Sequence, residues 1–364
     1  MSPAPEFAAR VARLPDYPVA GGYSLPDDVA LLASNESPWG PLPQVIEAAL
    51  RAVQRANRYP DPSYWELRTA LGERYGVAPN RIAIGNGSVD LLLAAGEALL
   101  EPGAEIVYAW PSFSVYPQLP AASGATAIEV PLDDEQRHDL DAMLEQVTVA
   151  TRLVIVCNPN NPTSTALPLA EIAAFVERVP AHVAVLLDEA YCEFNLLDDP
   201  DASIDLLDRH PNLILLRTFS KVYGLAALRV GFALCGDEAF VKALHQVRQP
   251  FVVNAAANAA AIEALRHQDA VAERVERTIA ARLEMEAGLG RLGLRFYASQ
   301  ANFAWLDLPD GVDEAAVVAG LAERGVIVRA GAALGREGSL RVTYGTTEHN
   351  ERFVDALGDL LRVG

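Results

Sequence analysis

One lysine of this chain lies in a stretch built for a protein interior. The segment RTFSKVYGLAALRVGFAL, residues 217–234, has strand-like apolar residues before Lys221 and a Gly/Ala-rich turn after it. The 364-residue chain has 27 arginines but only two lysines, Lys221 and Lys242. Lys242 lies in DEAFVKALHQVRQ, where a side chain that reaches to solvent explains it. Because lysine is rarely buried without a partner, we predict that Lys221 takes part in chemistry.

A partly desolvated lysine is a candidate nucleophile. Loss of water favours the neutral amine, which forms a Schiff base with an aldehyde. Pyridoxal phosphate is an aldehyde cofactor whose other groups find matching residues in this chain. Its ring nitrogen must stay protonated, which requires a buried carboxylate such as Asp188. Its ring oxygen needs hydrogen-bond donors, and Asn161 and Tyr191 are predicted to supply them.

The phosphate and the ring face of this cofactor need further residues. A stacked aromatic ring adds about 0.5–1.5 kcal/mol to simple burial, and Phe113 in AWPSFSVY is the candidate. Trp110 and Tyr116 compete for that role, although core packing is the expected use of both. A phosphate is bound by a helix N-terminus, hydroxyls and a guanidinium. The predicted phosphate site consists of Gly87, Ser88, Val89, Thr218, Ser220 and Arg229.

These motifs follow apolar runs that predict the fold class. Runs such as EIVYAW, RLVIVCN and NLILLRTFS lack polar alternation, which is typical of strands buried on both faces. We therefore expect an α/β fold with a mostly parallel mixed sheet and helices on both faces. Ligands of such sheets bind at the carboxyl ends of the strands, which is where the candidate residues lie.

The sequence also predicts three parts of the chain. Residues 1–30 are rich in proline and are expected to form an N-terminal arm. Residues 31–255 are predicted to be the large cofactor-binding domain. Long Ala/Glu/Arg helices and short strands then predict a smaller α/β domain over residues 256–364.

Composition excludes several classes of function. The net charge of −19 disfavours nucleic acid and anionic membranes as partners. There is no apolar run of the roughly 18 residues that a membrane span needs, and the N-terminus lacks a secretory pattern. The three cysteines have no paired spacing, so neither a disulfide framework nor a metal site is predicted. We expect a cytoplasmic enzyme with small-molecule substrates.

Taken together, the motifs resemble the fold-type I pyridoxal-phosphate-dependent aminotransferases, and within them the histidinol-phosphate aminotransferase group. The resemblance extends over essentially the whole chain. Each motif alone has an ordinary explanation, such as a helix cap or a turn, but their order and spacing are specific. The matching stretches are LLASNESPWGP, RYPD, GNGSVDLL, NPNNPTS, DEAY, TFSKVYGLAALRVG and SLRVTYGT.

The resemblance implies roles for individual residues. It makes Lys221 the residue that carries the cofactor, and Arg341 the anchor for the anionic group of the substrate. Tyr59 of RYPD is implied to reach the cofactor phosphate of a partner subunit, so a homodimer is expected. The remaining implied cofactor contacts are Asp188, Tyr191, Asn161 and Arg229.

Three positions depart from the usual pattern of that family. Ser164 and Ala227 stand where glycine is usual, and Val89 stands where an acidic residue is usual. None of the three removes a reacting group. They affect the expected shapes of the turns.

The expected reaction is a two-step exchange of an amino group, with glutamate and 2-oxoglutarate as one substrate pair. Histidinol phosphate, in histidine biosynthesis, is the predicted other amino donor. Its phosphate would occupy the place of an α-carboxylate, and a planar guanidinium binds either anion. The predicted anion site consists of Arg341 with Arg329, Asn35 and Tyr17. An aromatic amino-acid aminotransferase is the alternative that the motifs leave open.

Two further alternatives share the scaffold. Threonine-phosphate decarboxylase relatives have the same cofactor site but release carbon dioxide. Aminotransferase-like domains of transcription regulators follow a basic DNA-binding segment, whereas here the family match begins within the first ~35 residues of an acidic chain.

Overall fold

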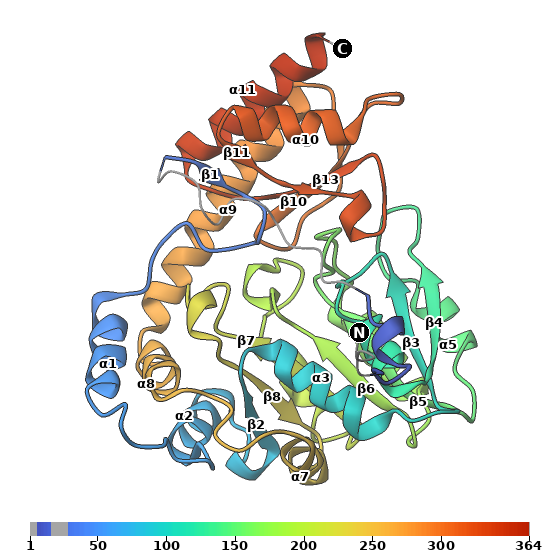
Figure 1. Ribbon diagram of the computed structural model, residues 1–364, viewed down its shortest axis with the longest axis vertical. Helices are drawn as coiled ribbons and strands as arrows, with labels where there is room; N and C mark the ends of the chain where they lie inside the picture. Colours follow the sequence, from blue (N-terminus) through green and yellow to red (C-terminus); the bar gives the residue numbers. More distant parts are fainter. Residues whose placement is uncertain (1–5, 16–27, 364) are drawn as a thin grey trace, which may run out of the picture.

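The computed structural model describes residues 6–15 and 28–363, and a seven-stranded sheet forms the centre of its larger part (Figure 1). The strand order is β2-β8-β7-β6-β5-β3-β4. Strand β8 runs antiparallel to β2 and β7, and the other neighbours are parallel. The predicted mostly parallel mixed sheet is therefore confirmed. The strands are β2 (Ile82–Gly85), β3 (Glu105–Trp110), β4 (Thr126–Pro131), β5 (Thr151–Cys157), β6 (Ala184–Asp188), β7 (Leu213–Thr218) and β8 (Gly231–Cys235).

Helices cover both faces of this sheet, as the unbroken apolar runs predict. In β6, Val185 and Leu187 belong to one core and Leu186 to the other. The first core includes α1 (Pro43–Val53), α2 (Trp65–Tyr75), α5 (Leu140–Glu145), α6 (Leu169–Arg178) and α8 (Ala255–Ala264). The second includes α3 (Ser88–Leu99), α4 (Gln118–Ser123) and α7 (Glu238–Val247).

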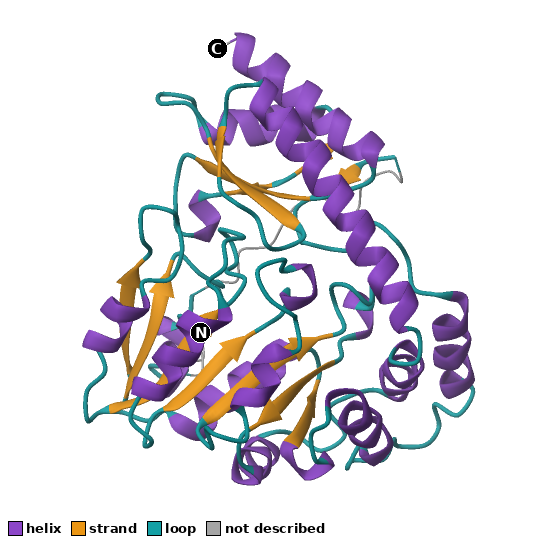
Figure 2. Ribbon diagram, turned by 180° about the vertical axis from the view of Figure 1, so that it is seen from behind, coloured by secondary structure: helices purple, strands orange, loops and turns teal. Residues whose placement is uncertain are grey.

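The smaller part has a four-stranded antiparallel sheet with helices packed on it (Figure 2). Its strand order is β12-β13-β10-β9, with β9 (Arg295–Phe296), β10 (Phe303–Asp307), β12 (Arg329–Ala330) and β13 (Ser339–Thr343). The helices are α9 (Gln268–Arg291), α10 (Glu314–Glu323) and α11 (Thr347–Val363). Strand β1 (Ala30–Leu31) pairs in parallel with β11 (Val326–Ile327), so a segment from early in the chain joins this part.

Helix α9 runs from the larger part into the smaller one (Figure 1). The alanines of α8 belong to the core of the large sheet, whereas Met285 and Leu289 of α9 belong to the core of the small part. The boundary near residue 255 stays a prediction, and we propose that the small domain begins within α9. Within the described ranges, no helix is both long and apolar enough to cross a membrane.

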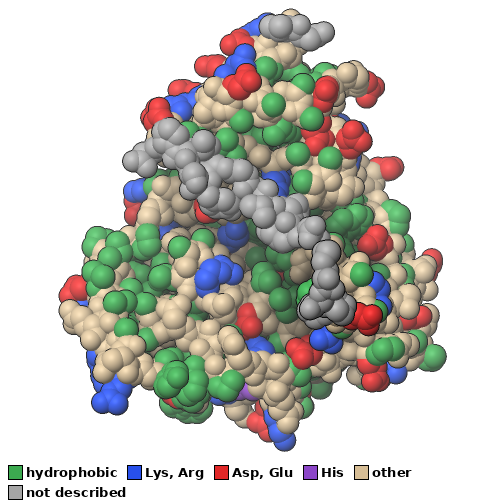
Figure 3. All heavy atoms as spheres, in the orientation of Figure 1, with side chains coloured by type: hydrophobic (Ala, Val, Ile, Leu, Met, Phe, Trp, Pro, Cys, Tyr) green, Lys and Arg blue, Asp and Glu red, His purple; other side chains and the backbone are tan. Residues whose placement is uncertain are grey.

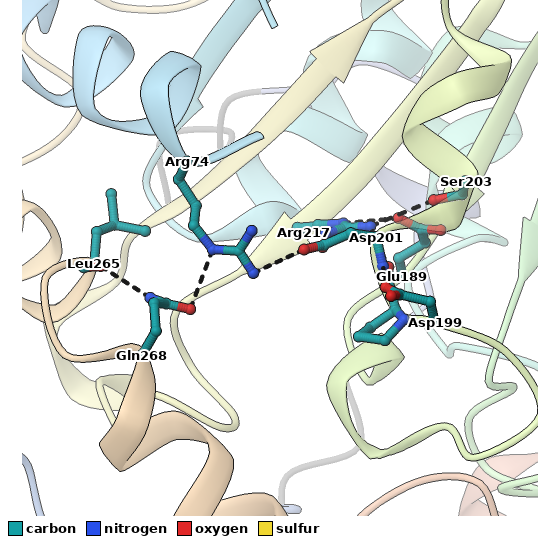
Figure 4. A network of polar contacts seen from close by, with 9 residues as sticks. Arg74, Glu189, Asp199, Asp201, Ser203, Arg217, Leu265 and Gln268 are labelled. Atoms are coloured by element: carbon teal, nitrogen blue, oxygen red, sulfur yellow. Dashed lines mark hydrogen bonds and ion pairs between the residues drawn. The ribbon is translucent and has the colours of Figure 1, made fainter. Parts of the chain in front are cut away.

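A buried ionic network fixes the ends of the two strands that lead into the site (Figure 4). Arg217, the second-last residue of β7, is 1% exposed. Its Nε donates to Glu189 Oε2 at 2.8 Å, and its Nη1 donates to Asp201 Oδ1 at 2.7 Å. Asp201 also pairs with Arg74 of α2, at 2.7 Å. Since Glu189 follows β6 directly, the network ties the ends of β6 and β7 together.

Replacing Arg217 should strongly destabilise the protein. Arg217→Met leaves Glu189 buried without its cation, which we expect to lower the free energy of unfolding by about 3–5 kcal/mol. Arg51→Met is the control, because Arg51 and Glu47 form an exposed pair worth at most about 1 kcal/mol. Urea denaturation measures both. Equal losses for the two variants would contradict the role given to the network.

Candidate active site

A cavity of about 680 Å³ lies at the carboxyl ends of β5, β6 and β7 and is also lined by residues of the small part. Lys and Arg side chains are visible near the centre of the face shown in Figure 3. The cavity brings together most of the residues that the sequence predicts for the site. Those lining it are Asn35, Ser88, Val89, Phe113, Asn161, Asp188, Tyr191, Thr218, Ser220, Lys221, Arg229, Arg329 and Arg341.

Lys221 lies three residues beyond the end of β7. Its Nζ donates to the backbone carbonyls of Ser34 and Asn35, at 3.1 and 3.0 Å. Burial lowers the pKa of this amine to about 7, and the positive charge of Arg341 acts in the same direction. A large neutral fraction at physiological pH suits a nucleophile, as the sequence predicts.

Asp188 ends β6 and is buried. Its Oδ2 accepts a hydrogen bond from the Tyr116 hydroxyl at 2.9 Å, and its Oδ1 accepts one from the Ala190 amide at 3.3 Å. Burial raises the pKa of this carboxyl to about 6, while the Tyr116 hydrogen bond opposes that rise. The carboxylate therefore has an unmet preference for a cationic partner inside the cavity.

Tyr116 is a site residue whose role the sequence did not reveal. The apolar pattern around it predicts core packing, and the ring does pack edge-on against Phe113, with centroids 5.7 Å apart. Its hydroxyl, however, is the side-chain donor to Asp188. A buried tyrosine usually finds such a partner, but the partner lies 72 positions away in the sequence.

Two hydrogen-bonded pairs among the lining residues lie near Lys221, one of Asn35 with Tyr191 and one of Arg341 with Asn161. Asn35 Nδ2 donates to the Tyr191 hydroxyl at 3.0 Å. Arg341 Nη1 donates to Asn161 Oδ1 at 2.6 Å. The Lys221 amine lies 5.5 Å from the centre of the Tyr191 ring. The two predicted donors for a ring oxygen thus lie in the same cavity as the lysine.

The predicted phosphate site is assembled where helix α3 begins. Ser88 is the first residue of this helix, so its free backbone amides point to the cavity end. Gly87 has a φ of 77°, which favours glycine, and a Cβ there would also meet the Arg229 guanidinium, so glycine suits both the turn and the close approach of the cation. Thr218 Oγ1 donates to Ser220 Oγ at 3.0 Å, and Arg229 Nη1 donates to the same oxygen at 3.4 Å.

Two arginines of the small sheet face the cavity together. Arg341 of β13 and Arg329 of β12 are directly opposite each other in the antiparallel register, which puts both side chains on one face. Both are buried. Arg341 Nη2 donates to the Ala33 carbonyl at 2.6 Å, so its guanidinium plane is fixed. A pair of buried cations is suited to an anionic substrate group.

The sequence model of the protein family "Aminotransferase class I and II" matches residues 27–357 of this chain. The chain belongs to this family. An aromatic amino acid aminotransferase of Cutibacterium acnes is 41% identical over 341 residues, covering 94% of this chain and 95% of that protein. A histidinol-phosphate aminotransferase of Geobacillus sp. is 41% identical over 335 residues, covering 92% and 91%.

A solved structure agrees with this assignment. A histidinol-phosphate aminotransferase from Sinorhizobium meliloti, in complex with pyridoxal-5'-phosphate, superposes with a TM-score of 0.87 at 29% identity. The match covers 100% of this chain and 99% of that chain. The predicted fold type and the predicted aminotransferase activity are confirmed.

The residues of the cavity fit pyridoxal phosphate. Asp188 is a buried carboxylate that forms no ion pair with a described residue, so it suits a protonated ring nitrogen, and the desolvated amine of Lys221 suits an aldehyde. The glycine turn packed on Arg229 suits a phosphate. This aminotransferase is pyridoxal-phosphate-dependent, and the role of each individual residue toward the cofactor stays a prediction.

The three departures from the family pattern are accommodated in different ways. Ser164 adopts a φ of 61°, in the left-handed region that favours glycine, and its hydroxyl donates to the Thr163 carbonyl at 2.6 Å. Ala227 lies in the 3₁₀ turn η5 (Ala226–Leu228), and its φ is not positive, so its backbone does not need glycine. Val89 lies in the first turn of α3 and packs against the second core of the sheet.

Of the described residues that the sequence predicts for the site, Gly87 and Tyr59 are not among those that line the cavity. Tyr59 is 82% exposed and stacks on Phe251, with ring centroids 4.6 Å apart. The role of Tyr59 toward a partner subunit stays a prediction. Tyr17 lies outside the described residues.

The pH dependence of Lys221 reactivity provides a test. In the cofactor-free protein, trace acetylation with acetic anhydride should modify Lys221 more readily as the pH rises through about 7, since the neutral amine is the nucleophile. Below that pH the lysine is protonated and unreactive. Lys242, on the exposed side of α7, is the internal standard, and peptide mass spectrometry resolves the two. A Lys221 midpoint near 10 would contradict the burial argument.

Proposed function

We propose that this enzyme transfers the amino group of an aromatic amino acid to 2-oxoglutarate. The observation that carries the proposal is the composition of the cavity around Arg341. Its lining includes the two cations, Arg329 and Arg341, and the apolar side chains of Phe113 and Leu334. The two cations match the carboxylate of such a substrate, and the apolar side chains match its ring. Relatives 41–46% identical to this chain bear the name aromatic amino acid aminotransferase, which supports it.

Histidinol phosphate is the second candidate. The observation that favours it is the second buried arginine, Arg329, because a phosphate ester accepts more hydrogen bonds than a carboxylate. The sequence-based preference for this substrate stays a prediction.

Half-reactions of the purified enzyme decide between the two substrates. Phenylalanine, tyrosine and histidinol phosphate are each mixed with the enzyme, and the loss of cofactor absorbance gives kcat/KM. We expect the aromatic amino acids to exceed histidinol phosphate by about 10-fold or more, the range that pocket contacts provide. The reverse order would replace the proposal with the second candidate.

The chemistry is divided between the cofactor and the chain. Pyridoxal phosphate, when bound, supplies an electron sink for the charge left on the substrate α-carbon. Asp188 is proposed to hold the proton on the ring nitrogen, with Tyr116 orienting the carboxylate. Asn161 and Tyr191 are proposed to donate to the ring oxygen. The helix start at Ser88, with Arg229 and the two hydroxyls, is proposed to hold the phosphate.

Lys221 has two proposed tasks. Its Nζ would hold the cofactor covalently, and the free Nζ would accept the proton from the substrate α-carbon and later donate that same proton. A pKa of about 7 suits both directions, because the amine then exchanges protons near neutral pH.

Arg341 is proposed to anchor the substrate carboxylate and so to orient the α-carbon beside Lys221. Arg341→Ala should keep the cofactor absorbance, yet lower kcat/KM by about 30- to 150-fold, since losing a bidentate charged contact costs roughly 2–3 kcal/mol. Arg341→Lys should recover only part, because a point charge lacks the planar fork. Steady-state kinetics with tyrosine and with glutamate measure both. Unchanged kinetics in the alanine variant would move the anchor to Arg329.

We propose that the active enzyme is a homodimer in which Tyr59 reaches the partner's cofactor phosphate. Hydrophobic side chains gather on the α1 side of the molecule (Figure 3), including the exposed Ile46, Leu50 and Val53 of α1. Such a patch is typical of an interface.

Tyr59→Phe should leave the dimer intact and weaken cofactor affinity, because only a hydroxyl contact to the phosphate is lost. Sedimentation gives the assembly state, and titration of the cofactor-free protein gives the affinity. A fully active monomer at assay concentration would refute the shared site.

A further inference from the structure

Three consecutive carbonyls of one turn contact the two cations of the proposed mechanism. The Ala33 carbonyl accepts from Arg341 Nη2 at 2.6 Å. The next two carbonyls, those of Ser34 and Asn35, accept from Lys221 Nζ at 3.1 and 3.0 Å. The turn of residues 33–35 therefore touches both the proposed substrate anchor and the proposed proton carrier.

This turn is held in place by β13 of the small sheet. The Thr343 amide donates to the Leu32 carbonyl at 2.8 Å. The backbone N–H of Asn35 donates to the Thr343 hydroxyl oxygen at 2.9 Å. The same hydroxyl donates to Asn35 Oδ1 at 3.3 Å. Asn35 has a φ of 53°, a left-handed conformation that a non-glycine residue adopts only with support. The shape of the turn thus depends on its partners.

Asn302, directly before β10, is the side chain that shares an acceptor with the lysine. Its Nδ2 donates to the Asn35 carbonyl at 3.1 Å, the same oxygen that accepts from Lys221. Asn302 is 4% exposed, and both it and Lys221 line one small internal cavity of about 10 Å³. A carbonyl oxygen has two lone pairs, so a donor on one of them restricts the direction left for the amine.

We propose that Asn302 is a positioning residue for Lys221, acting through the carbonyl oxygen of Asn35. The inference rests on the proposed role of Lys221 as the proton carrier. Proton transfer requires close placement of the amine, and a displacement of about 1 Å costs roughly 100-fold in rate. Asn302 is uncharged, so we assign it the placement of the amine. The protonation of the amine depends first on burial and then on the groups that face it, which are Arg341, Glu36, Arg229 and the Tyr191 ring.

Kinetics of Asn302→Leu test the placement. Leucine keeps the size of the side chain and removes the donor. We expect kcat to fall about 10- to 100-fold while KM stays within about 2-fold, since Arg341 keeps its hydrogen bonds to Asn161 and to the Ala33 carbonyl. With α-deuterated tyrosine, the isotope effect on kcat should rise, because proton transfer becomes slower than the other steps. Thr343→Val, which frees Asn35 from the other side, should act in the same direction.

Acetylation of the cofactor-free protein provides a readout that does not depend on turnover. Asn302→Asp places a negative charge beside the shared oxygen, which favours the ammonium form. The pH midpoint for acetylation of Lys221, relative to Lys242, should therefore rise above that of the wild type. In Asn302→Leu the midpoint should change little, while the reaction rate of the neutral amine changes.

The matched control is Asn350→Leu. Asn350 is another buried asparagine of the small part, and it contacts the Gly345 amide and the Ala281 carbonyl but no residue of the cavity. Its loss should affect stability without changing the isotope effect or the acetylation of Lys221. The proposal is overturned if the Asn302 variants match the wild type in both readouts, or if Asn350→Leu changes them equally. Borohydride reduction that fails to label Lys221 would instead refute the proposed function.

Discussion

The loss of water around two titratable groups is the constraint on which the rest of this structure depends. Burial lowers the pKa of Lys221 to about 7 and raises that of Asp188 to about 6. Both shifts disfavour charge in the cavity, and both make the cavity suited to a cofactor that reacts with an amine and carries a protonated nitrogen. The fold must therefore hold two buried titratable groups in place, and it does so from the ends of adjacent parallel strands.

The rigidity of those strand ends comes from contacts outside the cavity. The Arg217 network joins the end of β7 to the residue after β6. It therefore restrains the distance between Asp188 at the end of β6 and Lys221 after β7. The turn of residues 33–35 adds a second support from the small sheet. The cavity is thus bounded by two bodies that share few covalent connections but several buried hydrogen bonds.

Much of this could be predicted from the sequence, because the informative residues follow apolar runs. Strands buried on both faces leave a clear pattern, and Lys221, Asp188 and Asn161 stand where those runs stop. The roles of Tyr116 and Asn302 could not be predicted this way. Tyr116 acts through a hydrogen bond to a residue 72 positions away, and Asn302 through one to a residue 267 positions away. Neither periodicity nor motif spacing predicts such a contact. The identity of the substrate could not be predicted from the sequence for a similar reason, since side chains from distant segments together shape the substrate site.

The scarcity of lysine has a practical consequence for handling the protein. Lys242 lies on the exposed side of α7, which follows β8. Because β8 is antiparallel to β7, α7 begins at the end of the strands opposite the cavity. Once the cofactor occupies Lys221, amine-directed coupling has one side-chain target left, besides the α-amino group. Every side-chain tether of a surface-bound or dye-labelled preparation would then lie at one defined position on α7.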